Sequence, residues 1–178
     1  MSNSISKIID GYNPLDFEKR LASFLRSLFE NLTIQDPVDK NNKMKINIYE
    51  SEFPERDVTK LNKLSPYCLA QFVKETYTEE GCIFLGRVII STYGQNTSIN
   101  RQDNQVIGSH IVNKLITNPN GALNPFRILV KGKYKITYEL VEQQPTSLFV
   151  FGFVQFYCLA FTAMNNALEE FAKLLGGN

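Results

Sequence analysis

The strongest constraint in this chain is a run of fourteen residues, 148–161, in which Gln155 is the only strongly polar side chain. Successive side chains of a strand point to opposite faces, so this run divides into two rows. The rows are Phe149, Phe151, Phe153, Gln155, Tyr157, Leu159, Phe161 and Val150, Gly152, Val154, Phe156, Cys158, Ala160. Both rows are apolar, which predicts a packed layer on each face, from the same subunit or from a neighbour. The run is too short for a membrane span, which needs about twenty apolar residues.

Size and charge narrow the class of protein. A chain of 178 residues is predicted to form a single domain that buries about 70% of its extended surface. Lys and Arg number 19 and Asp and Glu 18, so a formal charge of +1 gives no overall field for nucleic acid. The first residues are polar and unlike a secretion signal, which predicts a protein that stays in the cytoplasm of the cell that makes it. Three cysteines in apolar runs favour buried, reduced thiols over disulfides.

Helix signals occur at three places. Asn13, Pro14 and Asp16 form a helix start, with an N-cap, a proline in the first turn and an acid near the positive end of the dipole. An apolar stripe follows at Leu21, Phe24, Leu25, Leu28, Phe29 and Leu32. Asp103 is expected to cap a second helix that buries Val106, Ile107, Ile111, Leu115 and Ile116. A third helix is expected over 162–175, with one face made by Met164, Leu168, Phe171, Ala172 and Leu175.

Strand signals fill much of the remainder. Strands are expected at residues 45–50, 66–77, 82–92, 126–130, 134–140 and 148–161. Polar segments at 36–43, 51–65 and 94–103 are expected to be surface loops. The order of elements predicts an α+β fold in one domain, with a mostly antiparallel sheet and helices packed on one face. Residues 1–12 would form an N-terminal arm and 163–178 a C-terminal helical extension.

Candidate chemistry is sparse. His110 is the only histidine and has no carboxylate at helical spacing, which favours a structural role over a catalytic base. The cysteines are too scattered for zinc, and no phosphate-binding loop or nucleophile motif occurs. The adjacent acids at 79–80 and 169–170 are typical of solvated charge. We therefore expect no enzyme activity, no catalytic residues, no metal and no cofactor.

A series of weak features follows one order along residues 45–161. A short strand ends in a proline-containing loop, a proline opens the next strand, a polar loop leads to a helix closed by Asn-Pro, and aromatics surround a glycine in the last strand. These features are Tyr49-Glu50-Ser51-Glu52-Phe53-Pro54, Pro66-Tyr67-Cys68-Leu69, residues 106–116 followed by Asn118-Pro119, and Phe149-Val150-Phe151-Gly152-Phe153-Val154.

In this order the features resemble the small tail-terminator and neck (head-tail completion) proteins of tailed bacteriophages. The resemblance covers about two thirds of the chain. The chain departs from the pattern in its C-terminal extension and in a longer polar insertion between Ile34 and Met44.

The resemblance implies a structural virion protein that forms a ring, usually of six subunits, on the end of the tail tube. Such a ring joins the tube to the neck or head connector, so the implied partners are other copies of the chain, the tube protein, the connector protein and possibly the tail sheath. No membrane partner is implied, and DNA would at most pass through the ring lumen. The implied location is the tail-neck region of the virion, with assembly in the host cytoplasm.

Two other hypotheses stay open at this point: another neck, tail-completion or baseplate component, and a small-ligand-binding domain that uses the aromatic sheet as a pocket wall. Contact surfaces are expected in the segments 51–65 and 94–103 and in the C-terminal helix. Two lysines that flank a glycine also belong to this set, although solvated lysines are the simpler interpretation. The candidate interface residues are Arg56, Lys60, Gln95, Asn96, Arg101, Lys131, Lys133 and Phe171.

Overall fold

The computed structural model describes residues 13–36, 41–50, 64–78, 81–141 and 148–160. The elements are α2 (Pro14–Phe29), β1 (Thr33–Gln35), β2 (Lys43–Lys45), β3 (Asn47–Glu50), β4 (Tyr67–Thr78), β5 (Gly81–Tyr93), α4 (Thr97–Thr117), β6 (Phe126–Leu129), β7 (Thr137–Leu140) and β8 (Phe149–Ala160). The expected N-terminal arm, residues 51–63 of the surface loop expected at 51–65, and the expected C-terminal helix lie outside the described residues.

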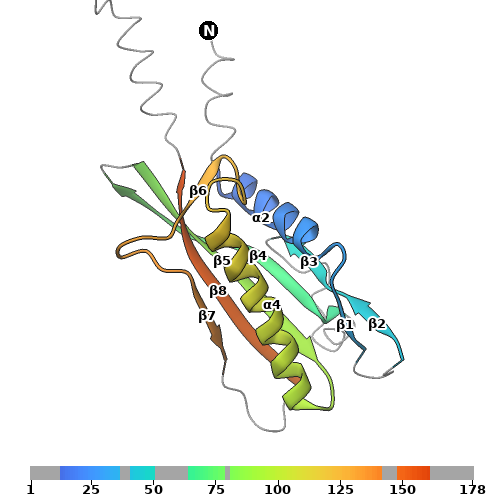
Figure 1. Cartoon of the computed structure of the whole chain (residues 1–178). Helices are drawn as coiled ribbons and strands as arrows, with labels where there is room; N and C mark the ends of the chain where they lie inside the picture. Colours follow the sequence, from blue (N-terminus) through green and yellow to red (C-terminus); the bar gives the residue numbers. More distant parts are fainter. Residues whose placement is uncertain (1–12, 37–40, 51–63, 79–80, 142–147, 161–178) are drawn as a thin grey trace, which may run out of the picture.

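A six-stranded sheet forms the centre of the fold, and both helices lie on the same face of it (Figure 1). The strand order is β3-β4-β5-β8-β6, and β7 also pairs with β8. All pairs in this sheet are antiparallel except β3 with β4. The predicted fold class, α+β with a mostly antiparallel sheet and helices on one face, is confirmed. Neither helix is long and apolar enough to cross a bilayer, within the part of the chain that is described.

Helix α2 begins where the sequence predicts. The side-chain oxygen of Asn13 accepts a hydrogen bond from the backbone N–H of Asp16 at 2.8 Å, and Pro14 is the first helical residue. Leu21, Leu25 and Phe29 of the predicted stripe are buried against the sheet, whereas Phe24, Leu28 and Leu32 are only partly buried. Phe17 and Ala22, which the stripe did not include, are also fully buried. The ring of Phe17 packs edge-on against Phe84 and Phe126, at centroid distances of 5.7 and 5.3 Å. These contacts make the helix side of the sheet the hydrophobic core.

Helix α4 begins seven residues earlier than expected, and the prediction of a surface loop over 94–103 is wrong for most of that range. Asn96 is the N-cap, and its side-chain oxygen accepts from the N–H groups of Ser98 and Ile99. Polar side chains lie on the buried side of the first turns because backbone carbonyls meet them there. The side-chain amide of Asn100 donates to the carbonyl of Gly94 at 2.7 Å, and that of Asn104 donates to Ile90 and Val150.

The buried positions of α4 are partly as predicted. Ile107, Ile111 and Leu115 are fully buried, but Val106 and Ile116 are 56% and 50% exposed. The two exposed positions are adjacent to buried ones in the sequence, so they point about 100° away around the helix axis. An apolar residue type therefore did not identify the buried face at these two positions.

Three details of strand pairing also differ from the predictions. β1 and β2 form a small antiparallel hairpin around the segment that was predicted to be only a loop. β2 takes the start of the strand predicted at 45–50, and β3 takes the rest. The strands predicted at 126–130 and 134–140 are shorter, as β6 and β7, and both pair with β8: β6 from Phe126↔Ala160 to Leu129↔Tyr157, and β7 from Thr137↔Gln155 to Leu140↔Gly152.

The two rows of β8 have different surroundings. The row from Val150 to Ala160 is buried beneath the helices, as predicted. The row from Phe149 to Leu159 is only half-buried, and no described helix lies on that side of the sheet (Figure 1). Within the described part of one subunit, a layer therefore covers only one of the two apolar rows. The prediction allowed the second layer to come from a neighbouring subunit, and that part stays a prediction.

Candidate functional site

The half-buried side of the sheet carries partly exposed apolar side chains on two neighbouring strands, and we call it the open face. Its centre is made by alternate residues of β5 and β8, which pair from Cys82↔Ala160 to Tyr93↔Phe149. These residues are Leu85, Arg87, Ile89 and Tyr93 of β5 and Phe149, Phe151, Phe153, Gln155, Tyr157 and Leu159 of β8. All of them are partly exposed, so several large apolar side chains meet solvent side by side. Contiguous patches of this kind mark interaction sites in proteins.

Ring contacts hold the aromatic residues of the open face in place. Tyr93 and Phe149 are cross-strand neighbours with ring centroids 4.8 Å apart, and Phe149 stacks on Phe151 at 6.0 Å. At the other end, Tyr134 lies beside Tyr157 at 5.2 Å. Rigid aromatic rings lose little conformational entropy when they are covered, which suits them to binding another polypeptide.

A polar row crosses the middle of this apolar surface. The strand register aligns Gln71, Arg87, Gln155 and Thr137 from β4 to β7. The guanidinium carbon of Arg87 lies 5.7 Å from the centre of the Phe153 ring. With the amide of Gln155 oriented to satisfy both groups, its oxygen accepts from Nε and Nη2 of Arg87 at 3.2 and 3.3 Å. The open face therefore presents a positive charge between two apolar areas, and an occupant that covers it must supply an acceptor for Arg87.

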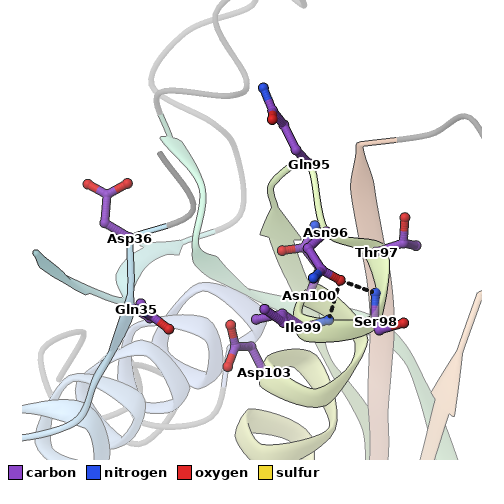
Figure 2. Close-up of a pocket in the computed structure, with 9 residues that line it drawn as sticks. All are labelled: Gln35, Asp36, Gln95, Asn96, Thr97, Ser98, Ile99, Asn100 and Asp103. Carbon is purple, nitrogen blue, oxygen red and sulfur yellow. Dashed lines mark hydrogen bonds between the residues drawn. The ribbon is translucent and has the colours of Figure 1, made fainter. Parts of the chain in front are cut away.

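A polar hollow of about 530 Å³ lies at the N-terminal end of α4 (Figure 2). It is lined by Gln35, Asp36, Gln95, Asn96, Thr97, Ser98, Ile99, Asn100 and Asp103. Figure 2 shows the cap hydrogen bonds of Asn96, which occupy the side-chain oxygen of that residue. Partial burial raises the pKa of the Asp103 carboxyl group. The predicted contact residues Gln95 and Asn96 thus line the same hollow. The side-chain oxygen of Asn96 is already used there as the N-cap of α4.

A second hollow, of about 510 Å³, lies beyond the C-terminal end of α4 and contains the two predicted lysines. Lys131 and Lys133 line it together with Arg127 and Tyr134, and the Lys133 ammonium group lies 5.2 Å from the centre of the Tyr134 ring. Gly132 between them has a φ of +69°, a conformation that favours glycine. The two predicted groups of contact residues are therefore at opposite ends of α4.

The other predicted contact residues are not joined to these groups. Arg101 is an exposed residue of α4. Arg56, Lys60 and Phe171 lie outside the described residues.

Groups with catalytic potential are separated or buried. Among the described residues, no three His, Cys, Asp or Glu side chains are close enough to hold a metal ion. His110 is exposed, with its ring 6.0 Å from that of Phe29. Cys68, Cys82 and Cys158 are buried free thiols, and burial raises the pKa of each, so all three stay protonated at neutral pH.

Arg87 and its polar row were missed at the sequence level, although a signal was present. Arg87 is the only charged residue in the otherwise apolar run 82–92, and Gln155 is the only strongly polar residue in 148–161. Two such exceptions in neighbouring antiparallel strands indicate a cross-strand pair, but only the register shows that they are opposite each other.

Comparison with models of known protein families gave no match, and comparison with curated proteins found none similar to this chain. The arrangement of its own residues is therefore the basis for a functional conclusion, and the open face is its most informative part.

Proposed function

We propose that this chain is a structural protein of a bacteriophage virion, and that it forms a ring that caps the tail tube and joins it to the neck. The observation that carries this proposal is the open face. A chain that exposes Phe149, Phe151, Phe153 and Tyr157 side by side gains free energy by covering them with another polypeptide, at roughly 25 cal/mol for each Å² of apolar surface removed from water.

The order of elements also supports the proposal. The tail-terminator resemblance rests on a short strand, a long hairpin, a helix and a closing aromatic strand, and the chain has these as β3, β4 with β5, α4 and β8. The described residues bring together no catalytic or metal-binding group at the open face, which fits a surface for assembly.

A closed ring places specific demands on the surfaces of a subunit. Each copy must use two different patches, because one patch of a subunit meets the other patch of the next subunit. The open face would be one of these patches. The tube protein and the connector protein would then meet the two flat sides of the ring, with the tail sheath as a further partner and DNA passing through the lumen.

Mass measurement tests the assembly step. We expect the full chain to elute as an oligomer in size-exclusion chromatography with light scattering, alone or with the tube protein. Phe153→Asp should lower the mass toward that of the 20.3 kDa chain, because it places a charge on the open face. Gln105→Asp, which adds the same charge at an exposed position of α4, is the matched control. A wild-type chain that is strictly monomeric, both alone and with the tube protein, would contradict the proposal.

Placement in the particle tests the finer role. Electron cryo-microscopy of virions should show the protein as a ring at the head-proximal end of the tail. Density at another position would favour a different neck, tail-completion or baseplate component that uses the same open face.

A further inference from the structure

We propose that the open face of each subunit is covered by the C-terminal segment, residues 161–178, of a neighbouring copy. This inference rests on the proposed ring and names the second patch that a ring requires.

The occupant must match a long, narrow apolar surface. β8 has twelve residues and is therefore about 40 Å long. Eighteen residues follow it in the chain, and as a helix they would extend about 27 Å, or two thirds of that length. Their apolar positions Met164, Leu168, Phe171 and Leu175 recur at helical spacing and would form one continuous stripe.

The other large hydrophobic residues exposed in the described part are farther apart. Leu15 is on α2, Tyr77 is on β4, Val130 and Leu148 lie just outside strands, and Ile99, Val106 and Ile116 are at least seven residues apart along α4. Outside the described part, residues 51–63 are rich in charge, and residues 1–12 carry only three isoleucines, close together. The C-terminal segment is therefore the best apolar match in the sequence.

Charge distinguishes this arrangement from one in which two open faces pack together. Arg87 lies in the central row of the open face, so two overlapping faces would bring two guanidinium groups into one apolar interface. The C-terminal segment instead carries Glu169 and Glu170 beside its apolar stripe, with Lys173 as its only cation. It can supply the acceptor that Arg87 needs.

The chain direction favours contact between copies over contact within one copy. The segment follows the last residue of β8 directly, and no glycine or proline occurs from 161 to 175. Of the residue types that favour tight turns, the segment has only Asn165 and Asn166, which lie five and six residues beyond β8 and inside the expected helix. A face on one subunit and a C-terminal segment on the next also make the two different patches of a closed ring.

A complementation experiment with full-length variants tests the inference. Phe153→Asp damages the open face, and Phe171→Asp damages the C-terminal stripe. Each variant alone should associate at least tenfold more weakly than the wild type in light scattering. An equimolar mixture should form a heterodimer of twice the chain mass, because one intact face and one intact segment remain, and it should not close into a ring.

Controls separate a docking effect from misfolding. Asn166→Asp adds the same charge on the opposite side of the expected helix and should keep the wild-type mass. Circular dichroism should show folded variants; if Phe153→Asp unfolds, Tyr157→Asp replaces it at the other end of the open face.

Each other outcome has a definite meaning. The inference would be overturned if Phe171→Asp kept the wild-type mass. It would also be overturned if both variants lost the oligomer and their mixture formed no heterodimer, a result that would indicate that the segment lies on its own subunit. In either case an oligomeric wild type would leave the proposed ring standing. A wild type that is monomeric alone and with the tube protein would overturn both.

Discussion

The two faces of the sheet are both apolar, yet they are built differently. On the face beneath the helices, a Cβ at Gly86 would collide with Phe17 of α2 and one at Gly152 with Asn104 of α4, so the helices approach the strands closely. Buried polar groups there have partners, as when the Tyr138 hydroxyl donates to the side-chain oxygen of Asn104 at 2.9 Å. The open face has large rings in place of glycines and a charged Arg87 in its middle. Small residues and satisfied buried hydrogen bonds, and not apolarity alone, distinguish the core from the open face.

The largest contrast between the faces is expected for two phenylalanines of the same strand. Phe156 is fully buried beneath α2, whereas Phe153 is partly exposed on the open face. Phe156→Ala should lower the free energy of unfolding by about 3–5 kcal/mol, through lost burial and a cavity. Phe153→Ala should lower it by roughly 1 kcal/mol and should mainly weaken association. Urea unfolding at several protein concentrations measures both, and equal losses would contradict the distinction.

The next largest loss of stability is expected where α4 approaches the sheet closely, at Gly108. A Cβ at Gly108 would collide with the ring of Tyr138. Gly108→Ala should therefore destabilise the chain by about 1–3 kcal/mol, although alanine is the better helix former. Ser109→Ala changes the exposed neighbour on the same helix and should be neutral or slightly stabilising in the same thermal unfolding assay. If Gly108→Ala raised the melting temperature, α4 would have room to move away from β7.

The hydrogen bond between Tyr138 and Asn104 should have a somewhat smaller effect. Tyr138→Phe leaves the buried side-chain oxygen of Asn104 without this donor and should cost about 1–2 kcal/mol. Tyr134→Phe removes a hydroxyl group from a half-buried ring outside the core and is the control. Chemical denaturation compares the two variants, and a larger loss for Tyr134→Phe would show that the buried network is unimportant.

The same tyrosine predicts a pH dependence. Burial raises the pKa of Tyr138 from 10.0 to about 12. The folded state thus holds the phenol proton more tightly than the unfolded state, so this contribution to stability is complete below pH 10 and is lost as the pH rises toward 12. Tyr138→Phe should lack this part of the alkaline decline. Unfolding curves from pH 9 to 12 measure the difference, and parallel declines would contradict it.

The smallest effect is expected at the polar hollow. Partial burial raises the pKa of Asp103, which means that the folded state disfavours the ionised carboxylate. Asp103→Asn should therefore increase stability slightly at neutral pH, and the gain should disappear as the pH falls below the ordinary value of 3.8, where the carboxyl group is neutral in both states. Thermal unfolding at pH 3 and pH 7 tests this, and a destabilised variant at pH 7 would indicate a bonding role for the carboxylate.

Local signals in the sequence were reliable where they depend on neighbouring residues. The Asn13 cap, the proline that follows it and the stripe of α2 located that helix, and the strands β4, β5 and β8 were predicted within one or two residues. The start of α4 was missed because Asn100 and Asn104 are polar in sequence but reach backbone carbonyls of distant strands. The predicted contact residues Asn96 and Lys133 fall in two separate hollows, which spacing along the chain could not reveal.

The sequence by itself determined that the last strand is apolar on both sides, that the cysteines lie in apolar runs and that helices pack on one face of a mostly antiparallel sheet. Periodicity and residue type carry this information because the direction of a side chain depends on residues only a few positions away in the same helix or strand. Only the tertiary structure decided which side of β8 is covered, and that Arg87 and Gln155 meet across it. Register and layer order depend on residues far apart in the chain, and their energies arise only when the whole sheet is assembled.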